Sequence, residues 1–150
     1  MSDLFHFPKM HKKCTVVHSW FYDSVYNVNF YVAYGTAEDL EKYLALEFDY
    51  QIGDLDFVGR TIFIKDPFRV IVLFNSDKIL HVSAYKYADI LAHEGFHAVD
   101  FVFERLGVEL EPKGNNEHWS YYLGFVVLRT TEFLMDSIKI YKKAKLEESR

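Results

Sequence analysis

Two histidines and a glutamate are spaced in a way that suits metal chemistry: His93 and Glu94 are followed three positions later by His97. The surrounding residues have helical periodicity, and side chains four positions apart project from one face of a helix, about one turn apart. Two imidazoles placed in this way can bind one Zn²⁺, while Glu94 lies beside them and reaches the metal-bound water. The sequence therefore predicts a metal site on a helix.

A catalytic zinc site needs a third protein ligand, because three protein groups and one open position make up its tetrahedral shell. Asp100 and Glu104 lie on the stripe of the histidines, but a helix rises about 1.5 Å per residue and carries them away from a metal held between the two rings. The longer H-E-x-x-H-x-x-G-x-x-H pattern is broken, since Asp100 replaces its glycine and Phe103 its last histidine. The remaining candidate is Glu117, which lies twenty positions after His97 in the first turn of the next expected helix.

The run from Asn116 to Gly124, N-E-H-W-S-Y-Y-L-G, resembles the second metal-binding helix of the gluzincins, zinc metallopeptidases of the thermolysin-like group. The family pattern is N-E-x-x-S-D-x-x-G, at the same interval from the last motif histidine. The resemblance covers about residues 85–128. It implies a zincin-like fold, in which a small sheet with one short helix precedes the active-site helix and a long helix carrying the third ligand. The roles that it implies are zinc ligation by His93, His97 and Glu117, general-base catalysis by Glu94, and orientation of His97 by Asn116.

Two features depart from the thermolysin-like pattern. Tyr121 stands where the family has an aspartate that supports the first histidine, so the support of His93 is unassigned. In addition, about 26 residues follow Gly124, too few for the downstream domain on which these enzymes carry a substrate-polarising histidine. The chain thus resembles a minimal gluzincin, an outline shared by small H-E-x-x-H proteins of phage and prophage origin and by cytoplasmic metallopeptidases that cut repressors. Tyr121, one turn after the glutamate ligand, is the first candidate for a catalytic oxyanion stabiliser. The next candidates are His118, Tyr85 and Tyr87.

The elements that must position these residues are strands first and long helices last, an order typical of an α+β fold. The expected strands span residues 15–22, 26–34, 60–65, 70–74 and 79–83, with turns at 23–24 and 75–77. A short helix is expected to start at Thr36, a second to span about 85–106 and end at Gly107, and a third to run from Asn115 or Asn116 to about Lys143. The expected core stripe of the second helix is Ala92, Phe96, Val99, Phe103 and Leu106. That of the third is Trp119, Leu123, Val126 or Val127, Phe133 or Leu134, and Ile138.

Composition limits the class of protein. The 150 residues are 50% hydrophobic and 18% aromatic, which suits one globular domain over residues 1–150. The net charge of −5 offers no basic surface for nucleic acid, and charged residues interrupt each apolar stretch before it reaches the roughly 20 residues of a membrane helix. The N-terminus lacks signal-peptide features, and the single cysteine, Cys14, cannot form an intramolecular disulfide. We therefore expect a cytoplasmic protein, and its oligomeric state stays open.

The expected activity is hydrolysis of a peptide or protein substrate with one Zn²⁺ per chain. Such substrates add as an extended strand to a sheet edge, and the segment from Lys78 to Ala84, just before the motif helix, is the expected edge. Two alternatives remain. One is a catalytically silent, zinc-stabilised binding or regulatory protein in which the metal joins two helices. The other is a hydrolase that uses the same metal site on a non-protein amide.

Overall fold

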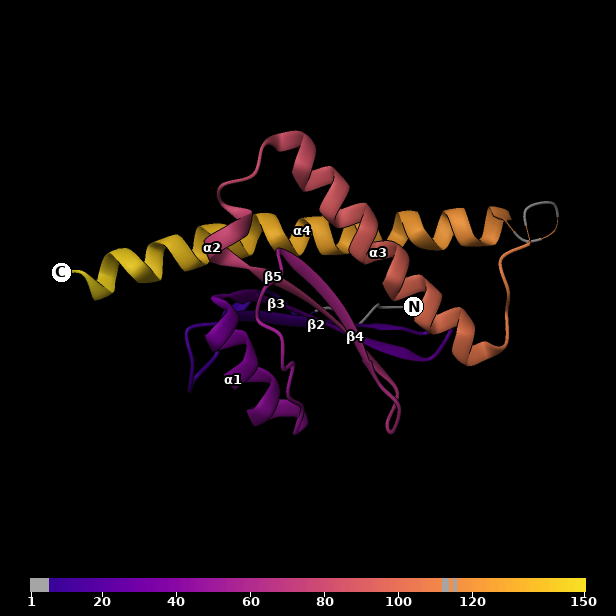
Figure 1. The fold of residues 1–150 in the computed structure, drawn as a ribbon, viewed down its shortest axis with the longest axis horizontal. Helices are drawn as coiled ribbons and strands as arrows, with labels where there is room; N and C mark the ends of the chain where they lie inside the picture. Colours follow the sequence, from indigo (N-terminus) through magenta and orange to yellow (C-terminus); the bar gives the residue numbers. More distant parts are fainter. Residues whose placement is uncertain (1–5, 112–113, 115) are drawn as a thin grey trace.

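The computed structural model describes residues 6–111, 114 and 116–150, without the side chain of Asn116. The elements occur in the order β1 (Lys9–Met10), β2 (Val17–Asp23), β3 (Val28–Gly35), α1 (Ala37–Phe48), β4 (Gly59–Ile64), β5 (Arg69–Asn75), α2 (Ser76–Ile79), α3 (Ala84–Leu106) and α4 (Asn116–Glu148). They form three layers: α1 covers one face of the sheet, and α3 and α4 cover the other (Figure 1). The α+β class expected from the sequence is confirmed.

The sheet has the strand order β1-β2-β3-β5-β4. Strands β3 and β5 are parallel, and the other neighbouring pairs are antiparallel. Strand β5 is buried on both faces because successive side chains alternate between them: Val70, Val72 and Phe74 face the layer of α3 and α4, whereas Ile71 and Leu73 face α1. The two edges of the sheet are β1, which is only two residues long, and β4.

The hairpin and the short helix occur where the sequence predicts them, but the turn spans residues 24–27 and not 23–24. Strands β2 and β3 pair through a tight turn in which Asn27 has a φ of 54°, a conformation that asparagine tolerates well. Helix α1 begins after Thr36, whose side chain accepts a hydrogen bond from the backbone N–H of Asp39 at 3.2 Å. This bond satisfies one of the free donors at the helix start.

The strand expected at residues 79–83 is wrong. The segment after β5 forms the short helix α2 and a turn, because the Asn75 side chain accepts a hydrogen bond from the N–H of Asp77 and so caps a helix start. The same side chain donates to the carbonyl oxygen of Phe57 at 3.0 Å, which fixes its orientation. The segment from Lys78 to Ala84 is therefore not a sheet edge, and the edge nearest the motif helix is β4.

Helix α3 matches its predicted length and ends at Gly107, which has a φ of 68°. Its buried face is rotated from the predicted one: Val99 and Phe103 are buried, but Ala92, Phe96 and Leu106 are exposed. The reason is that α3 packs against both α4 and β4. The residues that these two neighbours bury are Leu91, Glu94, Gly95, Ala98, Val99, Val102 and Phe103.

Helix α4 starts where the sequence predicts and continues five residues beyond the predicted end, to Glu148. Most of its expected core positions are confirmed, since Trp119, Val126, Phe133 and Leu134 are buried. In Figure 1 this helix extends past the sheet at its C-terminal end. Within the described part of the chain, no helix combines the length and apolar content needed to span a membrane.

Candidate metal centre beside the edge strand

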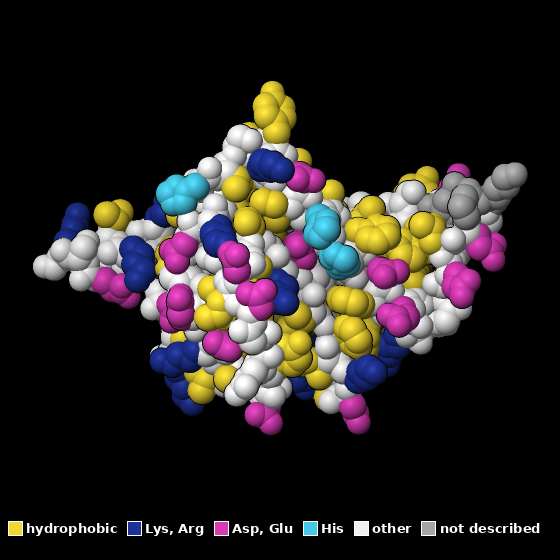
Figure 2. Space-filling view, viewed as in Figure 1, with side chains coloured by type: hydrophobic (Ala, Val, Ile, Leu, Met, Phe, Trp, Pro, Cys, Tyr) yellow, Lys and Arg dark blue, Asp and Glu magenta, His cyan; other side chains and the backbone are white. Residues whose placement is uncertain are grey.

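Helix α3 brings the two motif histidines together at ligand spacing. The Nε2 atoms of His93 and His97 are 3.1 Å apart, and the ring planes are nearly perpendicular, at 83°. Two nitrogen ligands at the usual 2.0–2.1 Å from a tetrahedral zinc ion lie about 3.3 Å from each other. Figure 2 shows two histidine side chains in contact near the middle of the face, with hydrophobic side chains beside and below them. The pair can thus donate two nitrogens to one metal ion.

The glutamate of the motif lies on the inner side of the same helix. Glu94 is only 6% exposed, and its Oε2 accepts a hydrogen bond of 2.7 Å from the Thr61 hydroxyl of β4. The same hydroxyl oxygen lies 3.0 Å from the carbonyl oxygen of Glu94. Because a hydroxyl has one proton, Thr61 serves one of these acceptors at a time. The edge strand therefore fixes the orientation of the Glu94 carboxylate.

Close approach between α3 and β4 depends on a glycine. A Cβ at Gly59 would lie 2.8 Å from Cγ of Glu94 and 2.9 Å from Cγ2 of Ile90, too close for any other residue without a shift. A glycine within a strand often marks such an approach. A hollow of about 250 Å³ opens here, and its lining includes Gly59, His93 and Glu94. His93 and Glu94 therefore line one hollow next to the start of β4.

The other end of β4 forms a second, aromatic hollow along α3. The His97 ring stacks on Phe101 at 6.4 Å between centroids, and Phe101 contacts Phe63 of β4 at 4.6 Å. Both phenylalanines line a hollow of about 290 Å³ together with Phe68 and the charged side chains of Lys65, Glu104 and Arg105. Along α3, the first hollow thus lies at His93 and the second lies beyond His97, and each is also lined by a residue of β4.

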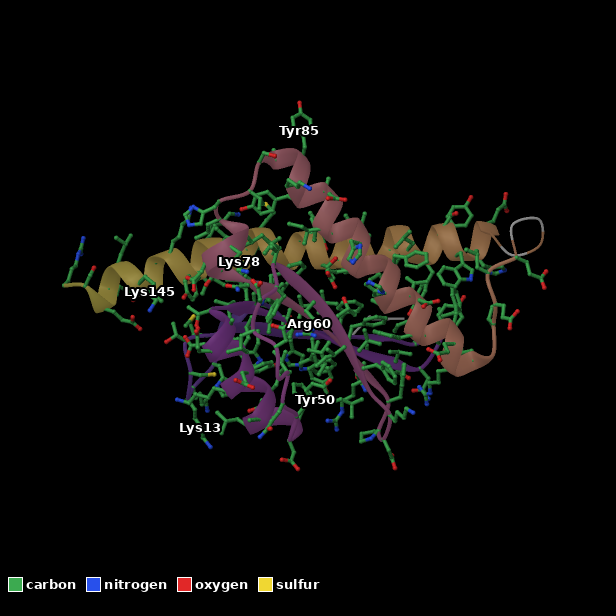
Figure 3. All side chains as sticks on the ribbon, in the orientation of Figure 1. Lys13, Tyr50, Arg60, Lys78, Tyr85 and Lys145 are labelled. Carbon is green, nitrogen blue, oxygen red and sulfur yellow. The ribbon has the colours of Figure 1, made fainter. Side chains whose placement is uncertain are left out.

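The structure does not bring the other predicted site residues to the histidine pair. Glu117 is exposed in the first turn of α4, and among the residues that the structure describes no group of three or more His, Cys, Asp or Glu side chains could hold a metal ion. Tyr121 is 77% exposed and lines a different cavity, together with His118. Tyr85 is 89% exposed and points away from the molecule at the start of α3 (Figure 3). The role expected of Asn116 depends on a side chain outside the described residues.

Two residues of the site were missed in the sequence. Thr61 belongs to the strand expected at residues 60–65 and Gly59 precedes that range, but nothing in the sequence connects this strand with the motif helix. The one local signal is Gly59 itself, at the start of a run rich in β-branched and aromatic residues. No local pattern pairs Thr61 with Glu94, because 33 positions separate them.

Comparisons of the chain with protein-family models, with curated proteins and with solved structures found no match. The function of the chain must therefore be inferred from its own residues: the geometry of His93, Glu94 and His97, the contact of Glu94 with Thr61, and the position of β4.

Proposed function

We propose that the chain is a zinc-dependent metallopeptidase of the gluzincin type with a zincin-like fold, in which His93 and His97 hold the metal and Glu94 acts as the general base. The observation that carries the proposal is the 3.1 Å separation of the two Nε2 atoms next to a buried, oriented carboxylate. Glu117 is proposed as the third ligand on the resemblance of its helix to the gluzincin pattern. A zinc ion supplies, when bound, the Lewis acidity that polarises a carbonyl group and acidifies water.

The protein groups would act as follows. The Glu94 carboxylate accepts the proton of the attacking water and returns it to the leaving amine nitrogen. Thr61 holds Oε2 of Glu94 in place while the carboxylate is ionised. Once Glu94 carries the proton, the Thr61 hydroxyl can turn to the Glu94 carbonyl oxygen, which lies 3.0 Å away. Thr61 is thus a positioning residue for the base in either protonation state.

The edge strand β4 supplies a binding site for an extended peptide. It is the last strand in the sheet order, so the backbone N–H and C=O groups on its outer side have no strand partner within the described sheet. An added peptide strand would form backbone hydrogen bonds along this edge. The two hollows along α3 would then take side chains on either side of the scissile bond. This assignment replaces the edge expected at residues 78–84.

Metal content tests the ligand set. The purified chain should contain about one zinc per molecule by elemental analysis, and His97→Ala and Glu117→Ala should each lose it. His81→Ala, which removes a histidine on the segment after α2, is the matched control and should keep the metal. A folded wild-type protein that takes up no zinc would contradict the metal site. Retention of full zinc affinity by Glu117→Ala would remove only Glu117 from the ligand set.

Glu94→Gln tests catalysis separately from metal binding. This variant keeps the size of the side chain and a hydrogen-bond partner for Thr61, so it should keep the fold and the zinc. Cleavage of fluorescein-labelled casein should fall by at least a hundredfold, within the range expected for loss of a general base. Normal cleavage by Glu94→Gln would exclude Glu94 as the base. A zinc-loaded wild type that cleaves neither casein nor a peptide library would favour the alternative of a zinc-stabilised regulatory protein.

A further inference from the structure

A separate cavity of about 300 Å³ lies between the β2–β3 hairpin and the first turns of α4. It shares no lining residue with the two hollows beside α3. Its lining includes Tyr121, which therefore lies here and not beside the histidine pair. The residues that matter for its chemistry are Asp23, Tyr26, Tyr121, Tyr122 and Phe125.

A buried carboxylate forms one wall of this cavity. Asp23 is 5% exposed, and its Oδ2 accepts a hydrogen bond of 2.6 Å from the Tyr122 hydroxyl, while Oδ1 accepts one of 2.9 Å from the N–H of Val25. Burial, together with this hydrogen bond to Asp23, raises the pKa of Tyr122, so the phenol remains a donor. A carboxylate has about four lone-pair sites, and these two bonds use only two of them. Asp23 is therefore an acceptor whose negative charge faces a cavity.

Aromatic rings form most of the remaining wall. The Tyr26 and Tyr122 rings contact each other edge to face at 4.6 Å, and Tyr122 stacks on Phe125 at 6.2 Å. The faces of such rings are electron-rich and attract cations. The Phe125 ring already interacts with one, since Cζ of Arg129 lies 5.6 Å from its centroid. Of the residues that the structure describes, no lysine or arginine lines the cavity itself.

We propose that this cavity binds a methylated ammonium group, with Asp23 as the counter-charge and the rings of Tyr26, Tyr121 and Tyr122 as the aromatic lining. A free anion is disfavoured because Asp23 would repel it. A metal ion is disfavoured because Asp23 and His118 are the only carboxylate and imidazole side chains of the lining, and the part of the chain that the structure describes has no group of three or more His, Cys, Asp or Glu side chains that could hold a metal ion. A primary ammonium has three N–H donors to satisfy, whereas a trimethylammonium group has none and presents only methyl groups to the aromatic rings of the lining. The proposal does not depend on the metal site.

Two probes of the same shape test the charge. Choline has a positively charged quaternary nitrogen, and 3,3-dimethylbutan-1-ol has a neutral quaternary carbon in the same place. We expect choline to shift the amide resonances of Asp23, Tyr26 and Tyr122 saturably in a ¹H–¹⁵N correlation spectrum. The neutral alcohol should bind at least about tenfold more weakly, which corresponds to about 1.4 kcal/mol. Equal binding of the two compounds, or binding of neither, would overturn the proposal.

Two variants and a control test the residues. In Asp23→Asn the amide can still accept from Val25 and donate to the Tyr122 hydroxyl, so the hairpin contacts remain while the charge is lost. Choline affinity should fall about tenfold. Tyr121→Leu removes an exposed ring and should weaken choline binding without affecting the fold, which circular dichroism would verify. Tyr85→Leu removes an equally exposed ring outside the cavity and should change nothing. Unchanged choline affinity in either folded cavity variant overturns the assignment.

Discussion

The Thr61 hydroxyl connects two parts of the molecule that have no local relation in sequence. It lies on the edge strand, and its hydrogen bond of 2.7 Å to Glu94 holds the carboxylate on the inner side of α3. The two histidines of the same motif remain near the surface, and their Nε2 atoms face each other. At this scale one helical turn presents two histidines near the surface and a shielded, oriented carboxylate, which is the arrangement that the proposed metal site requires.

His18 on β2 makes the fold sensitive to acid. Burial lowers the pKa of this half-buried imidazole from its usual 6.5 to about 4; His11 and Lys9 add to the effect, and Glu47 opposes it. Between these two pH values the unfolded chain binds a proton at His18 that the folded chain does not. The stabilisation is therefore complete above about pH 6.5 and is lost as the pH falls towards 4.

The measurement is the melting temperature of the wild type and of His18→Gln at pH 7 and at pH 4.5, followed by circular dichroism. The melting temperature of the wild type should fall further between pH 7 and pH 4.5 than that of the variant, because glutamine does not titrate. Groups that do not interact with His18 contribute equally to both proteins and cancel in the comparison. An identical loss in the two proteins would show that His18 does not cause the acid sensitivity.

At the scale of elements, the contact between α3 and α4 depends on one of two glycines in the middle of these helices. A Cβ at Gly95 would lie 2.6 Å from Cγ2 of Val127 on α4, whereas a Cβ at Gly124 has no atom within 4 Å. At either position, replacing glycine by alanine would stabilise the helix by about 1 kcal/mol through helix propensity alone. The two substitutions therefore differ only in packing.

Gly124→Ala should raise the free energy of unfolding by about 0.5–1 kcal/mol. Gly95→Ala gains the same helix propensity but forces a methyl group against Val127, and overpacking costs about 1–3 kcal/mol. We expect Gly95→Ala to be less stable than Gly124→Ala by about 1–3 kcal/mol in urea unfolding. If Gly95→Ala were as stable as Gly124→Ala, the two helices would not be closely packed at this position.

At the scale of the whole molecule, a buried hydrogen bond connects the N-terminal hairpin to the last helix. The Tyr122 hydroxyl of α4 donates to Asp23 at the end of β2 across 99 positions of sequence. Tyr122→Phe would leave that oxygen of Asp23 without its donor, and a buried charged acceptor that loses a partner costs about 1–3 kcal/mol.

Tyr22, on the hairpin itself, provides the control. The Tyr22 hydroxyl donates to Oδ1 of Asn27 at 2.8 Å, in an exposed position where water can replace it. Tyr22→Phe should therefore change the free energy of unfolding by less than about 0.5 kcal/mol. Equal effects of the two substitutions in urea unfolding would mean that the Asp23 contact adds no stability to the fold.

The local elements were predictable because their signals lie within a few residues. Thr36 caps α1 and Gly107 ends α3. The Val, Tyr, Phe and Trp residues of β2 and β3 mark these two strands in the sequence. The segment after β5 was misread as a strand. The side chain of Asn75 can act in a turn or as a helix cap, and its contact with the distant carbonyl of Phe57 is part of the tertiary structure.

The sequence by itself determined that His93 and His97 lie one turn apart on a helix, because this spacing follows from backbone geometry alone. The structure confirms that spacing, while zinc binding and the role of Glu117 stay predictions. Only the tertiary structure decided that Glu94 is buried against β4, that β4 is the edge strand, and that Tyr121 lines another cavity. These outcomes depend on pairings across many positions of the chain, such as the parallel register of β3 and β5, which no local pattern encodes.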